Sequence, residues 1–334
     1  MERKIYFAGG CFWGVEHFFK GVDGVVKATP GYANGNLDHQ PSYEEVYTDK
    51  TGFAETVEVR YDPARVSLPE LVDLYFTVID PLSLNRQGGD VGTRYRTGVY
   101  YVSDEDRPPV ADRFEKEASR LGAPLAVELE PLRHFYPAEE YHQEYLDKNP
   151  GGYCHIPLPA FRYLRLYQDL KALLGDEPDP VARMAEASAL IQERMRWHWV
   201  GFYRVAPKGG VAGGAGTEIA PEDCELVLGP FAGPLACLRI GYGKGVCGTA
   251  WKERRTVIVP DVDRFPGHIA CSSLSRSEIV VPVYASRPAD PSPRHSRPDR
   301  ESSPVAVLDV DSAEPDTFGP LDALWLEKVA GLIG

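Results

Sequence analysis

Residues 10–14 read Gly10-Cys11-Phe12-Trp13-Gly14, and this stretch decides how the first half of the chain is interpreted. It follows a short apolar strand pattern at Ile5–Ala8 and opens a helix pattern at Trp13–Phe19. A thiol at the start of a helix faces unpaired backbone N–H groups and the positive end of the helix dipole, and both favour the nucleophilic thiolate. The flanking glycines leave room for a substrate. The segment predicts a reactive cysteine; the alternative is a buried structural thiol between two core aromatics.

Strand and helix patterns alternate on both sides of this segment. Further strands are predicted at Thr56–Tyr61, Gly98–Val102 and Ala126–Leu132, and further helices at Leu68–Val78, Glu105–Leu121 and Glu139–Asp147. This alternation favours mixed α/β layers over a helix bundle.

The second half of the chain begins after two more predicted helices, Phe161–Leu174 and Val181–Trp197, which an acidic, proline-containing hexad separates. Strands are predicted at Trp199–Val205, Glu225–Leu228, Thr256–Val259, Glu278–Tyr284 and Val305–Val310, and a last helix at Leu321–Ile333. We therefore expect one domain over residues 1–159, a connecting helix and linker over 160–180, and a second domain over 181–334. Residues 286–303 contain four prolines and four arginines and are expected to be an inserted loop.

Composition narrows the class of protein. The 334 residues include 36 Lys and Arg against 49 Asp and Glu, a formal charge of −13, which argues against nucleic acid as a partner. No apolar run reaches the ~20 residues that a membrane-spanning helix needs, so no membrane attachment is expected. Six cysteines without a Cys-x-x-Cys pair fit neither a disulfide scaffold nor a structural zinc site. We expect free thiols in a cytoplasmic protein.

Residues 4–157 resemble the peptide methionine sulfoxide reductase A family, because several short motifs of that family occur here in the same order. The motifs are Gly10-Cys11-Phe12-Trp13-Gly14, Gly31-Tyr32, Pro41-Ser42-Tyr43, Thr51-Gly52-Phe53-Ala54-Glu55, residues 89–96 (GDVGTRYR), residues 140–143 (EYHQ) and residues 149–154 (NPGGYC). The resemblance implies an α+β chain that begins with an α/β sandwich on a ferredoxin-like core. It also implies reduction of methionine S-sulfoxide without a metal or organic cofactor.

The same resemblance implies roles for individual residues. Cys11 would attack the sulfoxide sulfur, Glu55 would donate a proton to the oxygen, and Cys154 would resolve the resulting sulfenic acid as a disulfide. The resemblance also implies residues that bind the substrate. Tyr43 and Tyr95 would hydrogen-bond the sulfoxide oxygen, and Asp90 would orient the substrate. Phe12 and Trp13 would hold the S-methyl group. Thioredoxin would be the external reductant. Phe53 and Arg94 depart from the family, which usually has His and Gln there.

His142 and His155 are candidate metal ligands by residue type. Their spacing does not match that of paired ligands, so we expect polar helix-surface or hydrogen-bonded core side chains instead.

A formal Gly-x-Gly-x-x-Gly pattern at residues 243–248 suggests dinucleotide binding at first sight. The helix predicted after it, Thr249–Arg254, is too short for the crossover of a parallel βαβ unit, which argues against a nicotinamide site.

Residues 181–333 instead resemble a GAF domain and, within that superfamily, the free methionine-(R)-sulfoxide reductases. The matching stretches are residues 199–203 (WVGFY), 228–231 (LGPF), 236–237 (AC), 245–248 (GVCG), 267–271 (GHIAC), 277–280 (SEIV) and 307–311 (VLDVD). The resemblance implies an antiparallel sheet with flanking helices and a homodimer through the terminal helices.

In this second domain the resemblance implies Cys271 as nucleophile, Cys237 as its resolving partner and Cys247 as an auxiliary thiol. It implies a substrate pocket formed by Glu278, Asp309, Asp311, Trp199 and Tyr203. Clustered carboxylates raise one another's pKa, so one can stay protonated and donate to the sulfoxide while others hold the free amino group. Cys224 has no assigned counterpart.

The sequence therefore predicts a bifunctional thiol-dependent reductase. Protein-bound and free S-sulfoxide and free R-sulfoxide would be its substrates. Two alternatives remain: an enzymatic first domain joined to a non-catalytic, ligand- or redox-sensing GAF domain, and a thiol redox sensor without turnover.

Overall fold

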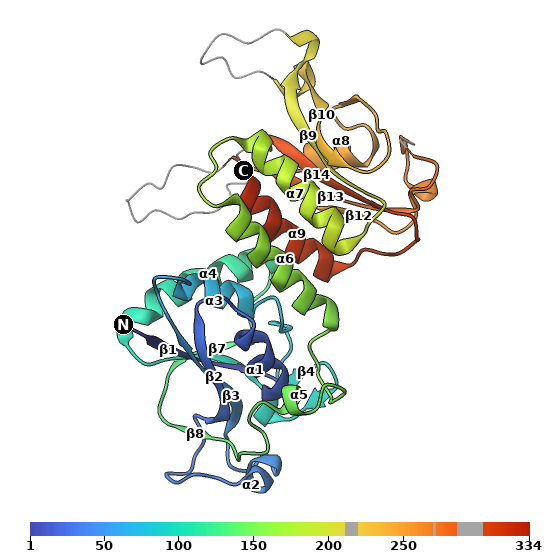
Figure 1. Ribbon diagram of the computed structural model, residues 1–334. Coiled ribbons are helices and arrows are strands. Elements are labelled where there is room, and N and C mark those ends of the chain that lie inside the picture. The colour runs from blue at the N-terminus through green and yellow to red at the C-terminus, as the bar shows by residue number, and fades with distance from the viewer. Residues whose placement is uncertain (211–219, 270–271, 286–302) are drawn as a thin grey trace. The chain divides into compact units, whose positions relative to one another are not determined.

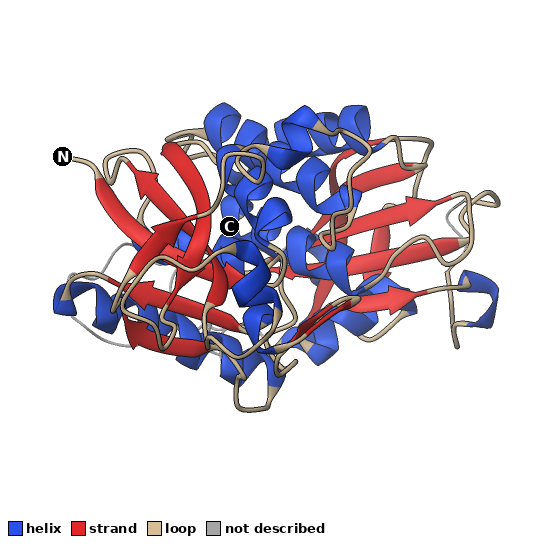
Figure 2. Ribbon diagram, turned by 90° about the horizontal axis from the view of Figure 1, so that it is seen from below, coloured by secondary structure: helices blue, strands red, loops and turns tan. Residues whose placement is uncertain are grey.

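The computed structural model describes residues 1–210, 220–269, 272–285 and 303–334 (Figure 1). Cys271 and nearly all of the predicted inserted loop, 286–303, lie outside the described residues. The chain divides into two units, Met1–Arg165 and Leu166–Gly334. Each contains both strands and helices (red and blue in Figure 2), so the prediction of two mixed α/β units is confirmed.

The first unit is built on a six-stranded sheet in the order β7-β6-β1-β3-β2-β8. Its neighbours pair antiparallel except β6 and β7, which are parallel. The strands are β1 (Arg3–Gly9), β2 (Val25–Ala33), β3 (Ala54–Tyr61), β6 (Thr97–Tyr101), β7 (Glu128–Pro131) and β8 (Phe135–Pro137), with a separate hairpin of β4 (Arg86–Gln87) and β5 (Asp90–Val91). The helices are α1 (Phe12–Lys20), α2 (Tyr43–Tyr47), α3 (Leu68–Tyr75), α4 (Arg107–Leu121), α5 (Tyr145–Lys148) and the first part of α6 (Leu158–Leu174).

Helix α1 forms because its apolar residues recur at helical spacing and cover the sheet. Val15, Phe18 and Phe19 are fully buried, and the Phe19 ring stacks on Phe7 of β1 at 4.6 Å between ring centroids. The helix contacts β1, β2 and β3. The central strands therefore fix the position of the helix that begins directly after Cys11.

Tyr75 of α3 holds the other side of β1. Its hydroxyl donates to the Ala8 carbonyl oxygen at 2.6 Å and accepts from the Gly98 N–H at 3.0 Å. This bridge joins β1 to β6 two residues before Gly10 and keeps the strand end rigid.

The predicted helix at Glu139–Asp147 is wrong, since only Tyr145–Lys148 is helical. The amide of Gln143 donates to the carbonyl oxygens of Pro30 and Ala138, at 3.1 and 2.9 Å, and Glu144 has a left-handed backbone with φ of 53°. Side-chain bonds to the main chain thus replace the helical pattern.

The second unit contains a six-stranded, wholly antiparallel sheet in the order β11-β10-β9-β14-β13-β12. Its strands are β9 (Trp199–Pro207), β10 (Cys224–Ala232), β11 (Arg239–Gly241), β12 (Val257–Val259), β13 (Ser277–Val283) and β14 (Ala306–Ser312); its helices include α7 (Pro180–Met195), α8 (Gly245–Glu253) and α9 (Pro320–Ile333). All seven residues of β13 are buried, so both faces of the sheet are covered, by α7 with α9 on one face and α8 on the other (Figure 1). Antiparallel pairing on both sides of α8 is incompatible with a parallel dinucleotide-binding unit.

None of the helices in the described residues combines the length and the apolar composition needed to cross a membrane.

Two candidate active sites

Cys11 caps the N-terminus of α1, at the end of the rigid β1 strand. Its thiol is free and 6% exposed. Burial raises the pKa of this thiol well above its usual value, and the nearby Glu55 carboxyl raises it further, while the Trp13 backbone N–H lowers it. The helix terminus thus acts in the predicted direction, but desolvation outweighs it, and the thiol is protonated in this state.

Glu55 lies on β3 and is 2% exposed. Its Oε2 accepts the Phe12 backbone N–H at 3.0 Å, so the carboxyl is joined to the peptide unit that follows Cys11. Burial raises the pKa of Glu55 from 4.5 to about 8, against the opposing effects of the Phe12 N–H and of Arg94. A carboxyl in this state is a proton donor at neutral pH.

Tyr43 and Tyr95 lie near this pair. Burial, then Glu55 and Cys11, raise the pKa of Tyr43 to about 12, and burial followed by Glu55 raises the pKa of Tyr95. Both phenols therefore keep their protons and can donate hydrogen bonds. Arg94 fixes Tyr95 by lying between two rings, with its guanidinium carbon 4.4 Å from the Tyr95 centroid and 4.2 Å from that of Tyr47.

The rings of four residues pack together beside Cys11, and we call this group the aromatic wall: Phe12, Trp13, His142 and Tyr145. Phe12 is buried, and Trp13 stacks on Tyr145 with centroids 3.7 Å apart. The Trp13 indole N–H donates to His142 Nδ1 at 3.1 Å, and the His142 ring lies 4.6 Å from that of Tyr43. His142 is therefore a buried organiser of the wall, as a hydrogen-bonded core side chain was expected to be.

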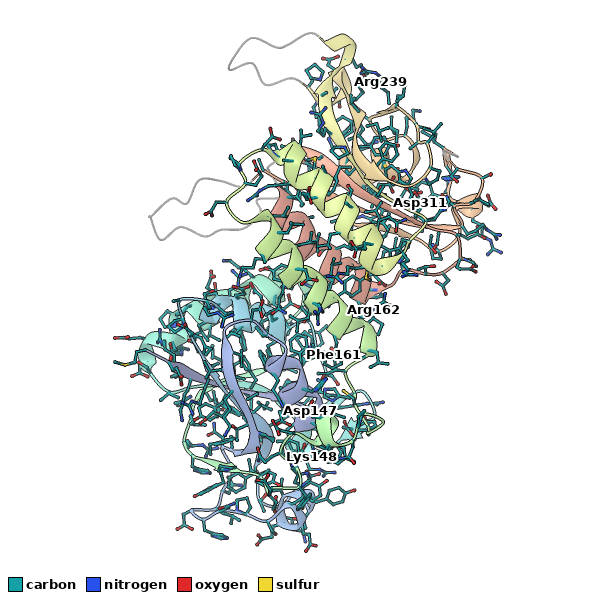
Figure 3. The ribbon with its side chains drawn as sticks, in the orientation of Figure 1. Asp147, Lys148, Phe161, Arg162, Arg239 and Asp311 are labelled. Carbon is teal, nitrogen blue, oxygen red and sulfur yellow. The ribbon has the colours of Figure 1, made fainter. Side chains whose placement is uncertain are left out.

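Glu16 attaches the loop that contains this wall to α1. Both of its carboxylate oxygens accept the Glu144 N–H, at 2.9 and 3.0 Å, and burial raises the pKa of Glu16 to about 7. Lys20 forms ion pairs with Glu144 and with Asp147, which is labelled in Figure 3.

Cys154 and Asp90 complete the first site. The Cys154 thiol is free and half-buried, and its Sγ lies 3.0 Å from the position that a Cβ on Gly14 would occupy. Burial raises its pKa. Asp90 accepts a hydrogen bond at 3.0 Å from the hydroxyl of Tyr153, the residue that precedes Cys154 in the chain. The structure thus brings all eight predicted residues of this domain to one region; sequence reasoning missed Tyr145 and Glu16, which act on the aromatic wall without any reactive motif.

The second site lies on one face of the antiparallel sheet. Asp309 and Asp311 are two residues apart on β14, and Glu278 of β13 is directly opposite Asp311. Glu278 and Asp309 are each 6% exposed, and burial together with the neighbouring carboxyls raises the pKa of both. Burial raises the pKa of Asp311, labelled in Figure 3, to about 6.

Trp199 and Tyr203 share this sheet face because they pair across from Asp311 and Val307. The Trp199 ring stacks on Tyr203 and Phe231, at 6.0 and 5.6 Å between centroids. It passes over Gly201, where a Cβ would lie 2.4 Å from the indole. Neither predicted aromatic lines the small cavity beside the carboxylates.

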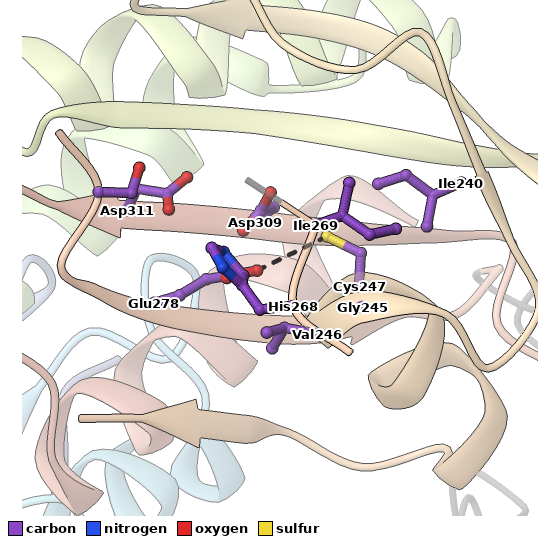
Figure 4. Close-up of a pocket in the computed structure, with 10 residues that line it drawn as sticks. Ile240, Gly245, Val246, Cys247, His268, Ile269, Glu278, Asp309 and Asp311 are labelled. Carbon is purple, nitrogen blue, oxygen red and sulfur yellow. Dashed lines mark hydrogen bonds between the residues drawn. The ribbon is translucent and has the colours of Figure 1, made fainter. Parts of the chain in front are cut away.

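That cavity has a volume of about 30 Å³ and is bounded by α8, β13 and β14 (Figure 4). Its lining residues are Ile240, Gly245, Val246, Cys247, His268, Ile269, Ser275, Glu278, Asp309 and Asp311. Cys247 is buried and its Sγ lies 3.9 Å from Glu278 Oε1. A sulfur and two carboxylate oxygens from Cys247, Glu278 and Asp309 lie within 4.8 Å of one another, close enough for one metal ion to reach all three. The sequence predicted these two carboxylates as part of a substrate-binding cluster and predicted no metal there.

The remaining thiols of the second unit differ in state. Cys237 is disulfide-bonded, whereas Cys224 and Cys247 are free. Cys271, the predicted nucleophile, lies outside the described residues.

A buried thiol beside a protonated carboxyl defines a site for thiol-dependent acid–base chemistry in the first unit. A family model described as "Peptide methionine sulfoxide reductase" matches residues 3–171. The "Peptide methionine sulfoxide reductase MsrA" of Clostridium acetobutylicum is 54% identical over 155 residues, which are 46% of this chain and 95% of that protein. The chain belongs to the peptide methionine sulfoxide reductase family.

Two solved structures are similar to different parts of the chain. Reduced Mxr1 from Saccharomyces cerevisiae is 40% identical, with 47% of this chain and 92% of that one covered and a TM-score of 0.45. A free methionine-R-sulfoxide reductase from Neisseria meningitidis, in complex with its substrate, is 40% identical, with 51% and 85% covered and a TM-score of 0.41.

Proposed function

We propose that the first unit reduces the S-sulfoxide of peptide-bound and free methionine through Cys11. The observation that supports this most directly is the hydrogen bond from the Phe12 N–H to Glu55, which holds an acid beside the nucleophile. The family's known substrate class is the second support. The strand order β6-β1-β3-β2, with α1 and α3 as connections, supports a ferredoxin-like core for this unit.

The first chemical step transfers oxygen from substrate to thiol. Glu55 donates its proton to the sulfoxide oxygen while the Cys11 sulfur attacks the sulfoxide sulfur. The Cys11 proton restores the carboxyl. The hydroxyl then leaves the substrate sulfur as the substrate S–O bond breaks, and it adds to the Cys11 sulfur as the bond between the two sulfurs breaks. The products are methionine and a Cys11 sulfenic acid. The Tyr43 and Tyr95 hydroxyls donate to the oxygen as its negative charge develops.

Substrate binding in this unit is assigned to the aromatic wall. Phe12 and Trp13 would receive the S-methyl group, because sulfur–aromatic contact is worth ~0.3–1.5 kcal/mol. Asp90, close to Cys154, would orient the substrate chain. Cys154 then condenses with the sulfenic acid to a disulfide, which thioredoxin reduces by thiol–disulfide exchange.

Replacement of Cys11 by serine tests the assignment. We expect Cys11→Ser to abolish reduction of the S-epimer of N-acetylmethionine sulfoxide, and Glu55→Gln to slow it by about 10²–10⁴-fold. Cys224→Ser, which removes a thiol of the second unit, serves as the matched control. Turnover of this substrate by Cys11→Ser at the wild-type rate would refute the proposal.

We further propose that the second unit is a GAF domain that reduces free methionine R-sulfoxide. Cys271 would attack the sulfur, Cys237 would resolve the sulfenic acid, and Cys247 would be auxiliary. The buried carboxylates Glu278 and Asp309 support this proposal, because a positively charged amino group would compensate their charge. That requirement would exclude peptides, whose methionine lacks a free amine.

Asp311 would share this role, with Trp199 and Tyr203 closing the sheet face around the substrate. Neither unit is proposed to need a metal or an organic cofactor. Thioredoxin would reduce both units, and α7 and α9 would form the interface of a homodimer.

One observation favours the sensing alternative for the second unit. A cavity of about 30 Å³ holds one or two water molecules, so an amino acid cannot enter unless lining side chains move. A module that only registers oxidant through its thiols would not need that space.

Resolved epimers separate these proposals. With the full chain and a thioredoxin system, we expect turnover of free R-sulfoxide, its loss in Cys271→Ser and its persistence in Cys11→Ser. N-acetylation of the R-epimer should abolish turnover. Absence of R-sulfoxide reduction in the wild-type chain would favour the sensing module.

A further inference from the structure

His155 is a half-buried histidine that the proposed chemistry does not use. Both ring nitrogens are inaccessible to solvent, and the Gly9 backbone is the hydrogen-bonding group that acts on the ring. One backbone group satisfies at most one ring nitrogen, so the other is left without a partner among the described residues. Buried polar atoms without a partner are rare in folded proteins, and a catalytic role is one explanation for them. The Gly9 backbone thus agrees with the hydrogen-bonded side chain expected from the sequence, while the second ring nitrogen has a role still to be explained.

The position of His155 links it to both thiols. His155 Nε2 lies 3.3 Å from the position that a Cβ on Gly10 would occupy, and Cys154 Sγ lies 3.0 Å from the corresponding position on Gly14. These glycines bracket Cys11 in the chain. The imidazole follows Cys154 directly in the chain, so the ring and the Cys154 thiol lie against the two glycines on either side of Cys11.

The disulfide-forming step needs a base at this position. Burial raises the pKa of Cys154, so at neutral pH its sulfur keeps the proton that it must lose to become a nucleophile. Burial lowers the pKa of His155, which leaves the imidazole neutral and able to accept that proton. Asp90 of β5 is the charged group that acts on the ring, and its carboxylate favours the imidazolium once it forms. The Cys11 and Cys154 thiols and the Glu55 carboxyl are the other titratable groups near this position, and the Tyr153 hydroxyl donates a hydrogen bond to Asp90.

We propose that His155 accepts the proton of Cys154 during formation of the Cys11–Cys154 disulfide. The Cys154 thiolate attacks the sulfur of the Cys11 sulfenic acid, the S–S bond forms and the S–O bond breaks. The departing hydroxide takes the proton from the imidazolium and leaves as water, so His155 ends neutral. The inference rests on the proposed function of the first unit, which supplies the sulfenic acid.

Single turnover without reductant separates the two chemical steps. Methionine released from N-acetyl-(S)-methionine sulfoxide measures the first step, and loss of free thiols measures the second. In His155→Gln we expect an unchanged first step, a second step slower by about 10²-fold and a sulfenic acid that dimedone traps. His39→Gln, at an exposed histidine of the same unit, is the matched control. An unchanged rate of thiol loss in His155→Gln would overturn the proposal.

A pH profile distinguishes proton transfer from packing. In the wild type, thiol loss should slow as pH falls and the imidazole becomes protonated; in His155→Gln it should depend on the thiol itself and recover only at alkaline pH. Added imidazole should restore part of the lost rate. A slow variant with an unchanged pH profile and no rescue would overturn the proposal.

The first step also reports folding. A His155→Gln chain that releases one methionine per Cys11 is folded, and His155→Asn serves if glutamine does not fit. Failure of the wild-type chain to release methionine would refute the function of the unit, a result distinct from failure of the His155 assignment.

Discussion

Replacement of Glu55 by glutamine should stabilise the first unit at neutral and alkaline pH although it removes the proposed acid. The carboxyl is 2% exposed, and burial raises its pKa from 4.5 to about 8. Between these values the unfolded chain releases the proton while the folded chain retains it. The free energy of unfolding therefore falls as pH rises through this window, and the loss is complete above pH 8.

The magnitude follows from the shift. One pKa unit corresponds to ~1.4 kcal/mol, so the ionisable carboxyl costs roughly 3 kcal/mol at pH 7 and roughly 5 kcal/mol above pH 8. Glutamine does not titrate, and its side-chain oxygen can still accept the Phe12 N–H. Glu55→Gln should therefore match wild type near pH 4.5 and exceed it increasingly towards pH 9.

Hydrogen exchange of peptides from β1 and β3, followed in urea at several pH values, measures the stability of this unit within the full chain. Glu140→Gln removes a carboxylate that is 93% exposed and serves as the control; its effect should not grow with pH. A Glu55→Gln difference that is independent of pH, or a variant less stable than wild type at pH 9, would refute the reasoning.

Three further outcomes are expected. Arg94→Gln removes a charge that lowers the pKa of Glu55, so the alkaline limit of S-sulfoxide reduction should move up by roughly half to one pH unit; an unchanged limit in a pH–rate profile would contradict this. Gly201→Ala places a Cβ 2.4 Å from the Trp199 indole and should destabilise the second unit by ~1–3 kcal/mol in denaturant titrations, where no loss would show that the ring can shift. Removal of metal ions with EDTA should leave both sulfoxide reductase activities unchanged, and loss of R-sulfoxide turnover that Zn²⁺ restores would instead assign a metal to the Cys247 cluster.

The sequence located the first site because its reactive residues sit in local motifs. Cys11 and Glu55 were both predicted, and the structure places them one hydrogen bond apart through Phe12. The state of the thiol could not be predicted in the same way. The helix terminus is visible in the sequence, but the burial that raises the Cys11 pKa depends on tertiary packing.

Elements without a clear period were missed or wrongly predicted. The β2 strand contains Pro30 and Gly31, which interrupt a strand pattern, yet Pro30 pairs in register with Val57 of β3 and its carbonyl oxygen accepts from Ala138 and Gln143. Those same bonds replace the predicted helix at Glu139–Asp147. Contacts between segments distant in the sequence decided both outcomes, and no local window contains them.

Gly10 and Gly14 show why the pentapeptide around Cys11 is a signature of the whole first site. Gly10 has φ of 81° and no space for a Cβ beside Gln87, so both its backbone and its surroundings require glycine. Gly14 is helical, and the atoms nearest to the position of its missing Cβ belong to Cys154 and Ile156. Tolerance of alanine at Gly14 should thus covary with the residue at position 154, whereas Gly10 should stay invariant in every chain that keeps this turn.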